Sequence, residues 1–283
     1  LSYQDTYYSQ NSSQKAYWEG CDIHGTVDFI CGGGDIRFQN TTISLEKRQV
    51  STDPDKDGKG SRTIVAPTTN TNFGYVFDGC TIVDLAEGKG DWNFGRTWQN
   101  QPITVYLNTT LDDNAKASII SKRWIEKGMN NTDPKVFGEF GTKDAAGTDI
   151  TPTSNKITSY GGQFETILTA EQAANYSFDK MFADWNPAVL AAQAEAPEAT
   201  YVNGNVTWGA AANTSRTATS SEPTAYAIFK NGELVSGILG TDVTSYAIDI
   251  DTETDILEIR AANGRGGFGE AKKVTIATGI EKV

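Results

Sequence analysis

The sequence predicts an all-β protein in which a right-handed parallel β-helix is followed by a small β-sandwich. Three observations lead to this prediction. A short apolar pattern recurs four times before residue 112, polar glycine-rich stretches separate some of the copies, and the character of the sequence changes near residue 195. We therefore expect residues 1–195 to form the β-helix and residues 196–283 to form the sandwich.

The recurring pattern is an aromatic residue, a cysteine or threonine three positions later, and an isoleucine or leucine two positions after that. A spacing of two is that of side chains on one face of a strand. Intervals of 20, 39 and 29 residues between copies are typical of coils of short strands that stack their inward side chains. An antiparallel sandwich with chance matches is the alternative. The copies begin at Trp18, Phe38, Phe77 and Tyr106.

The wider intervals contain two polar, glycine-rich stretches, 51–62 and 85–101. Long loops on a rigid scaffold are where functional sites are usually built. In the first stretch, Asp53, Asp55 and Asp57 have the spacing that begins a calcium loop, but its twelfth position is Ile64 instead of glutamate. This difference favours a solvated acidic loop over a calcium site.

The second half of the chain begins with helical signals and ends with short strands. Thr169 and Gln172 have the spacing of a capping box. An Ala/Pro/Glu-rich passage follows, and we expect the domain boundary between Ala194 and Glu198. Beyond it, short alternating strands separated by turn signals such as Asn231-Gly232 predict a small β-sandwich.

Charge and composition exclude several classes of partner. Twenty-four basic and 36 acidic side chains give a net charge of −12, which argues against a nucleic-acid groove and an anionic membrane surface. No apolar run approaches the roughly 20 residues that a membrane span needs. The cysteines Cys21, Cys31 and Cys80 lack C-x-x-C spacing and are interpreted as small core residues. With His24 as the single histidine, no metal site is expected.

Asp28 lies between Val27 and Phe29 in a stretch that reads as a buried strand, where an unpaired charge would be costly. Asp5 precedes it by 23 residues, about one coil of the predicted helix. Two carboxylates on neighbouring coils favour one protonated and one charged group, which supplies an acid and a nucleophile. Arg96 could hold the charged one, although Asp28 could instead pair structurally with Arg37.

Three segments, YQDTYY, GTVDFI-x-G and FGRTW, resemble in order and spacing the three signature blocks of pectin methylesterases. The resemblance extends from Leu1 to about Pro187. It implies a right-handed parallel β-helix that hydrolyses galacturonate methyl esters of pectin (homogalacturonan) and releases methanol without a cofactor. Stretches 226–232 and 260–266 of the second domain resemble fibronectin type III modules of secreted bacterial carbohydrate enzymes.

The resemblance also implies a role for each residue of the site. Asp28 would be the nucleophile, and Asp5 would be the general acid that later acts as the base. Gln4 would donate to the oxyanion. Arg96 would hold Asp28, and the aromatic side chains of Trp98 and Tyr8 would bind the sugar.

The chain departs from the family pattern in three respects. Thr97 stands where the family usually has proline, and Cys31 stands where an aromatic residue is common. The family also has a further oxyanion glutamine and additional coils upstream of the Gln-Asp-Thr block, and neither precedes Leu1. We therefore expect an N-terminally incomplete β-helix, which puts the activity of this chain on its own in question.

Two other functions stay open at this level. A non-catalytic polysaccharide-binding or adhesin β-helix derived from such an enzyme would hold pectin without releasing methanol. A calcium-dependent polysaccharide lyase would share the β-helix but release unsaturated products. For the leading hypothesis, a pectin methylesterase, we expect a monomer that is secreted, periplasmic or on the cell surface, with bacterial-type export.

Overall fold

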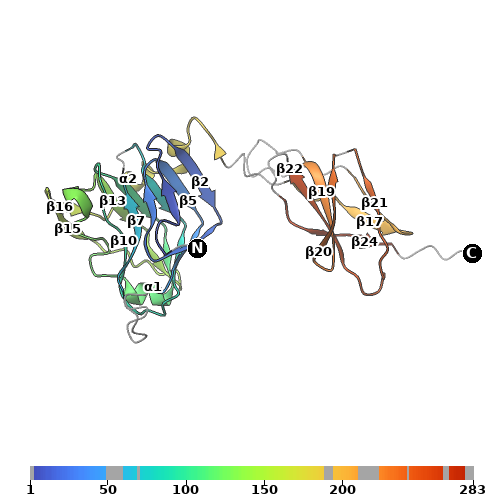
Figure 1. Cartoon of the computed structure of the whole chain (residues 1–283), viewed down its shortest axis with the longest axis horizontal. Helices are drawn as coiled ribbons and strands as arrows, with labels where there is room; N and C mark the ends of the chain where they lie inside the picture. Colours follow the sequence, from blue (N-terminus) through green and yellow to red (C-terminus); the bar gives the residue numbers. More distant parts are fainter. Residues whose placement is uncertain are drawn as a thin grey trace, which may run out of the picture. The chain divides into compact units, whose positions relative to one another are not determined.

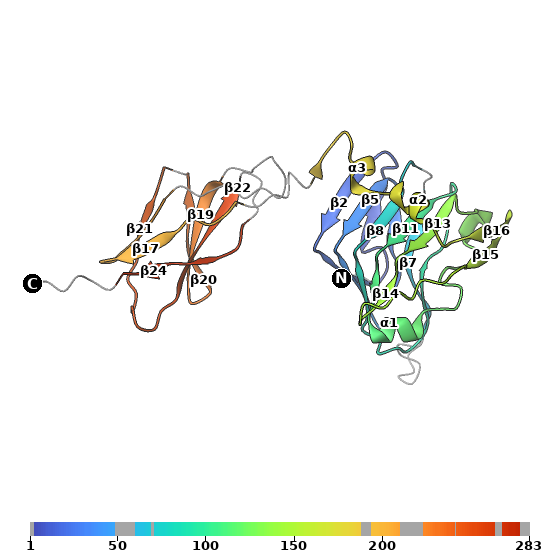
Figure 2. The same cartoon turned by 180° about the vertical axis from the view of Figure 1, so that it is seen from behind.

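The computed structural model describes residues 3–48, 60–68, 71–187, 194–209, 223–240, 242–263 and 268–277 (Figures 1 and 2). The chain forms two compact units, Leu1–Met181 and Phe182–Val283. Their division lies upstream of the boundary expected between residues 195 and 196. Ala194 and Ala196, from the passage that we expected to link the domains, are buried in the core of the second unit.

The first unit is a parallel β-helix, as predicted. Within its described residues the chain runs through three parallel sheets in turn. Each of the first four rounds adds a strand to each sheet, and the last round adds strands to the second and third sheets. The first sheet consists of β1 (Tyr7–Ser9), β4 (Val27–Gly32), β7 (Arg62–Pro67) and β10 (Trp92–Gly95). The second consists of β2 (Lys15–Glu19), β5 (Asp35–Gln39), β8 (Tyr75–Asp78), β11 (Ile103–Leu107) and β13 (Val136–Phe140). The third consists of β3 (Asp22–Gly25), β6 (Thr42–Leu45), β9 (Thr81–Asp84), β12 (Thr110–Leu111) and β14 (Lys143–Asp144).

The recurring sequence pattern becomes two columns of stacked side chains. The aromatic members pair in register across the second sheet, and their rings stack with successive centroid distances of 6.5, 4.7 and 4.4 Å: Trp18, Phe38, Phe77 and Tyr106. The aliphatic members pair likewise in the third sheet: Ile23, Ile43, Ile82 and Leu111. Each aromatic contact adds about 0.5–1.5 kcal/mol to the free energy of burial. The columns confirm that the repeat marks successive coils.

A left-handed residue turns the chain from the second sheet into the third in each coil. The residues with positive φ at this turn are Gly20, Asn40, Gly79, Asn108 and Gly141. Glycine and asparagine tolerate this conformation, whereas in most other L-residues it is disfavoured by a clash between Cβ and the backbone. A single backbone requirement thus explains why either of two residue types occurs at one point of every coil.

Replacing Asn40 with alanine should destabilise the first unit by about 1 kcal/mol, because alanine disfavours the left-handed backbone, with a φ of 49°, that asparagine and glycine tolerate. Asn40→Gly is the matched control and should leave the free energy of unfolding nearly unchanged. Urea denaturation of both variants measures the difference. Equal destabilisation by glycine and alanine would mean that the asparagine side chain, and not the backbone conformation, matters.

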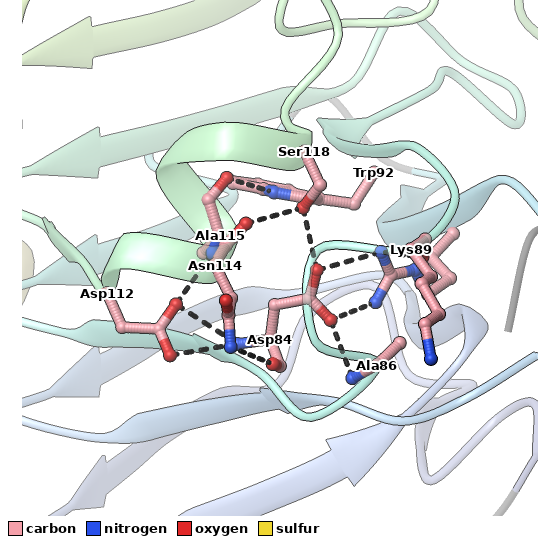
Figure 3. A network of polar contacts seen from close by, with 9 residues as sticks. Asp84, Ala86, Lys89, Trp92, Asp112, Asn114, Ala115 and Ser118 are labelled. Carbon is pink, nitrogen blue, oxygen red and sulfur yellow. Dashed lines mark hydrogen bonds and ion pairs between the residues drawn. The ribbon is translucent and has the colours of Figure 1, made fainter.

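Helix α1 (Asp113–Ser118) is fastened to the β-helix by a buried polar network (Figure 3). The carboxylate of Asp84 forms an ion pair with Arg62 in which both side chains are fully buried. Ser118 Oγ, at the end of α1, donates to Asp84 Oδ2 at 2.6 Å. At the other end of the helix, Asp112 caps the backbone amide of Ala115. The network therefore joins two coils to α1, with the fully buried Arg62–Asp84 pair at its centre.

Short helices cover the second sheet at the end of the first unit, where Figure 2 shows them from behind. Arg37 Nη1, from β5, donates to the carbonyl oxygen of Tyr176 at 2.9 Å, and Tyr17 packs edge-to-face on Phe178. The predicted capping box is confirmed at the start of α2. The remaining elements of this unit are η2 (Met129–Asn131), β15 (Lys156–Ser159), β16 (Gly162–Glu165), α2 (Ala170–Ala174) and α3 (Phe178–Met181).

The second unit contains two four-stranded sheets with a common core in its described residues. One sheet has the order β21 (Ser245–Ala247), β18 (Asn205–Trp208), β17 (Ala199–Val202) and β24 (Thr275–Ile276). The other has the order β20 (Glu233–Leu239), β19 (Pro223–Lys230), β22 (Leu257–Asn263) and β23 (Lys272–Lys273). The turn predicted at Asn231-Gly232 joins β19 to β20, and both of its residues have positive φ, as the tight turns of hairpins require.

Candidate active site

Asp28 lies in β4 at a point where this strand carries one extra residue. Val27 pairs with Thr63 and Ile30 pairs with Val65, so three steps along β4 match two along β7. Asp28 itself has a φ of 49°, and its side chain is almost completely buried. A bulge redirects a side chain, and a left-handed non-glycine residue persists only where its surroundings stabilise it. The backbone at Asp28 is therefore held in a strained conformation that sets the direction of this carboxylate.

Arg96 stabilises Asp28 in this conformation. It follows β10, two coils beyond β4 in the first sheet. Its Nε donates to Asp28 Oδ1 at 3.0 Å, and its Nη2 donates to Oδ2. Bidentate pairing of this kind fixes both the charge and the orientation of a carboxylate. The alternative structural pairing of Asp28 with Arg37 is wrong, because Arg37 forms its ion pair with Asp78 in the second sheet.

Asp5 occupies the preceding coil at the offset that the sequence predicts. In the pairing of β1 with β4, Tyr7 lies opposite Ile30, an offset of 23 residues that also separates Asp5 from Asp28. Asp5 is exposed and has a φ of 55°. Its Oδ1 accepts a hydrogen bond from Cys31 Sγ at 3.3 Å.

The thiol of Cys31 lies near both aspartates. Burial raises the pKa of this thiol well above its usual range, and the hydrogen bond and charge of Asp5 and the charge of Asp28 raise it further. The thiol therefore stays protonated and acts as a donor. The sequence pattern predicts Cys31 only as a core residue and a departure from the family pattern. The parallel register, which sets Tyr8 opposite Cys31, is the signal that places this thiol beside the segment of Asp5.

Two aromatic side chains lie close to each other, one shortly after Asp5 in the chain and one shortly after Arg96. Tyr8, from β1, is 49% exposed, and its ring centroid lies 6.3 Å from that of the half-buried Trp98. Gln4 is exposed and immediately precedes Asp5. Hydrogen bonds on either side hold its segment, since the amide of Thr26 donates to the carbonyl oxygen of Tyr3, and Thr6 Oγ1 donates to that of His24. A polar, partly exposed face with aromatic sides suits a sugar chain.

In the part of the chain that the structure describes, no group of three or more His, Cys, Asp or Glu side chains could hold a metal ion. The aspartates of the sequence-predicted acidic loop, Asp53, Asp55 and Asp57, lie outside the described residues. Within the described ranges, no helix is long and apolar enough to cross a bilayer.

His24 is held between two carboxylates on the third sheet. Its Nδ1 lies 2.8 Å from Glu46 Oε1, and its Nε2 lies 2.9 Å from Asp22 Oδ2. The hydrogen bond with Glu46 raises the pKa of His24; burial opposes this rise and Asp22 adds to it. Both ring nitrogens are thus engaged in structural contacts.

The pKa of His24 predicts a pH dependence of stability. Because this pKa is raised on folding, the stabilisation is complete below the unfolded value of about 6.5 and disappears as the pH rises through the higher folded value. His24 is the single histidine, so His24→Gln should remove this fall in melting temperature above about pH 6.5. The same fall in wild type and variant would show that another group causes it.

Known proteins match the part of the chain that contains the three segments YQDTYY, GTVDFI and FGRTW. The profile of the family described as Pectinesterase matches residues 1–184. The chain belongs to the pectinesterase family. It is 30% identical over 183 residues to a probable pectinesterase/pectinesterase inhibitor 47 of Arabidopsis thaliana, covering 62% of this chain and 27% of that protein. It is also 31% identical over 118 residues to pectinesterase 2 of Citrus sinensis, covering 39% of this chain and 21% of that protein.

The chain thus spans about a quarter of the length of the curated pectinesterases that it matches. Among solved structures it is similar to a pectin methylesterase from carrot, with 22% identity, a TM-score of 0.49, and coverage of 65% of this chain and 54% of that one. It is also similar to the enzyme from Yersinia enterocolitica, with 24% identity, a TM-score of 0.44, and coverage of 65% and 57%.

Proposed function

We propose that this chain carries the catalytic carboxylates of a pectin methylesterase, which hydrolyses methyl esters of galacturonate units in homogalacturonan and releases methanol. The observation that carries the proposal is the bidentate pairing of Arg96 with the buried, bulged Asp28, one coil from Asp5. A carboxylate that is oriented and kept from rotating is suited to attack a carbonyl carbon.

In the first step, an oxygen of Asp28 bonds to the ester carbonyl carbon and the carbonyl oxygen becomes an oxyanion. Gln4 donates amide hydrogens to this oxyanion. As the tetrahedral intermediate collapses, the bond from carbon to the methoxy oxygen breaks, and Asp5 gives its proton to that oxygen. Methanol leaves, and the acyl group remains bound to Asp28.

In the second step, the ionised Asp5 takes a proton from water, and the resulting hydroxide oxygen attacks the acyl carbon. The bond to Asp28 breaks, and Asp28 becomes a carboxylate again beside Arg96. Asp5 is protonated once more, and the galacturonate product loses its proton to solvent. Trp98 offers an aromatic face to the sugar, and Tyr8, whose ring lies beside that of Trp98, is a further contact for the sugar chain.

Methanol release from highly methylated pectin tests the proposal. We expect methanol from the esterified polymer, none from polygalacturonate, and no ultraviolet-absorbing unsaturated products. Unsaturated products would identify a lyase. Binding of pectin without methanol release, both by this chain and by a version extended upstream to the length of its relatives, would identify a binding protein and overturn the esterase.

Gln4→Ala should lower kcat for methanol release by on the order of 10²-fold with little change in KM, because an oxyanion donor acts chiefly in the transition state. Gln10→Ala is a matched control in the same exposed segment and should not change kcat. A loss that appears in KM alone would assign Gln4 to substrate binding.

For the second unit we propose a fibronectin type III-like β-sandwich, since its two four-stranded sheets enclose one core. Three of its aromatic residues are buried in that core: Tyr201, Trp208 and Tyr226. We also propose that the protein is exported, by a bacterial-type route, to act on pectin as a monomer. Size-exclusion chromatography with light scattering would show a dimer if the last point fails.

A further inference from the structure

Cys31 is held firmly beside the proposed acid. Its side chain is 2% exposed, and its carbonyl oxygen accepts a hydrogen bond from the buried Tyr75 hydroxyl at 2.6 Å. Main-chain pairing on both sides, with Tyr8 in β1 and Ala66 in β7, leaves the residue little freedom. Its sulfur lies 3.3 Å from Asp5 Oδ1. The rigidly held S–H donor of Cys31 therefore faces the carboxylate of Asp5, which lies in an exposed segment.

We propose that Cys31 is a positioning residue for Asp5: its S–H group holds Oδ1, so that Oδ2 is the oxygen that exchanges a proton with methanol and water. This inference rests on the proposed function, because the roles of the two oxygens have meaning only in the esterase reaction. A thiol is a weaker donor than a hydroxyl, but a carboxylate acceptor strengthens the bond.

The contact has a consequence for catalysis. With Oδ1 held by the thiol, Asp5 keeps one orientation in both steps, so that Oδ2 faces first the methoxy oxygen and then water.

The S–H stretching band in the Raman spectrum tests the contact without requiring activity. The band of Cys31 is identified by its loss in Cys31→Ser. In Asp5→Ala it should move to higher frequency, because its acceptor is gone. The bands of Cys21 and Cys80 are internal controls, since their thiols contact the backbone carbonyl oxygens of Glu19 and Phe38. A Cys31 band that does not respond to Asp5→Ala would overturn the proposal.

The kinetics of methanol release test the consequence for catalysis. In Cys31→Ala, kcat should fall by about three- to tenfold with little change in KM, because a misoriented acid slows the proton transfers without weakening substrate binding. Cys31→Ser keeps a donor and should stay close to the wild-type kcat. Equal losses of kcat in both variants would mean that Cys31 has a purely structural role. A wild type without methanol release would overturn the esterase, whereas the S–H band would still decide the contact.

Discussion

Replacing Asp28 with asparagine is expected to lower the rate of methanol release by on the order of 10³-fold or more. An amide cannot form the acyl-enzyme, so the two-step route is lost. Asparagine has nearly the shape of aspartate, and its carbonyl oxygen can still accept from Arg96. The variant should therefore fold, and methanol assays under saturating pectin measure the loss directly.

Asp22→Asn is the matched control for this experiment. Asp22 is an exposed aspartate of the neighbouring β3, it contacts His24, and it has no place in the proposed reaction. Its variant should keep full activity. Methanol release that survives in Asp28→Asn at more than about one tenth of the wild-type rate would remove Asp28 from the nucleophilic role.

The second large effect concerns stability and arises from the buried pair of Arg62 and Asp84 (Figure 3). Arg62→Met should destabilise the first unit by about 3–5 kcal/mol, because it leaves the Asp84 carboxylate buried without its charge partner. Ser118 and the amide of Ala86 still donate to this carboxylate but do not neutralise it. Urea denaturation followed by tryptophan fluorescence gives the free energy of unfolding.

The double variant Arg62→Met/Asp84→Leu separates charge from packing. It removes both charges and should recover at least half of the stability lost in the single variant. If the double variant is instead as unstable as the two single changes combined, the pair contributes mainly through shape.

The carboxylate of Asp84 also predicts how the stability of the first unit changes at acid pH. Burial raises the pKa of Asp84, but hydrogen bonds from Arg62 and Ser118 outweigh burial and hold the pKa below its usual value. The stabilisation is therefore present above the unfolded value of about 4 and is lost as the pH falls through the lower folded value. Wild type should lose stability in this range more steeply than the double variant.

The β-helix could be predicted because its coils repeat in the sequence. The aromatic residues that begin each copy lie in register in the structure, as do the aliphatic residues five positions later. The turn between them is equally regular, since only glycine or asparagine occurs there. Local patterns of this kind need no knowledge of the tertiary structure. The start of the second unit depends on packing of Ala194 and Ala196 into a core, which composition alone does not reveal.

The site was predictable in part for the same reason. The offset between Asp5 and Asp28 equals one coil, and it can be counted along the chain. The bulge at Asp28 could not be predicted, because a bulge is defined by the partner strand β7 and not by β4 itself. The Cys31–Asp5 contact was missed because alternation of apolar residues indicates that a side chain is buried, without saying which polar group it faces.

The stacking of coils makes the separation of Asp28 and Arg96 independent of loop length. Neighbouring strands of a sheet lie about 4.8 Å apart whatever joins them. The link from the third sheet back to the first is residue 26 alone in one coil, residues 46–61 in the next, and residues 85–91 in the one after. Evolution can therefore lengthen these links, and vary what they recognise, while the ion pair spanning two coils keeps its geometry.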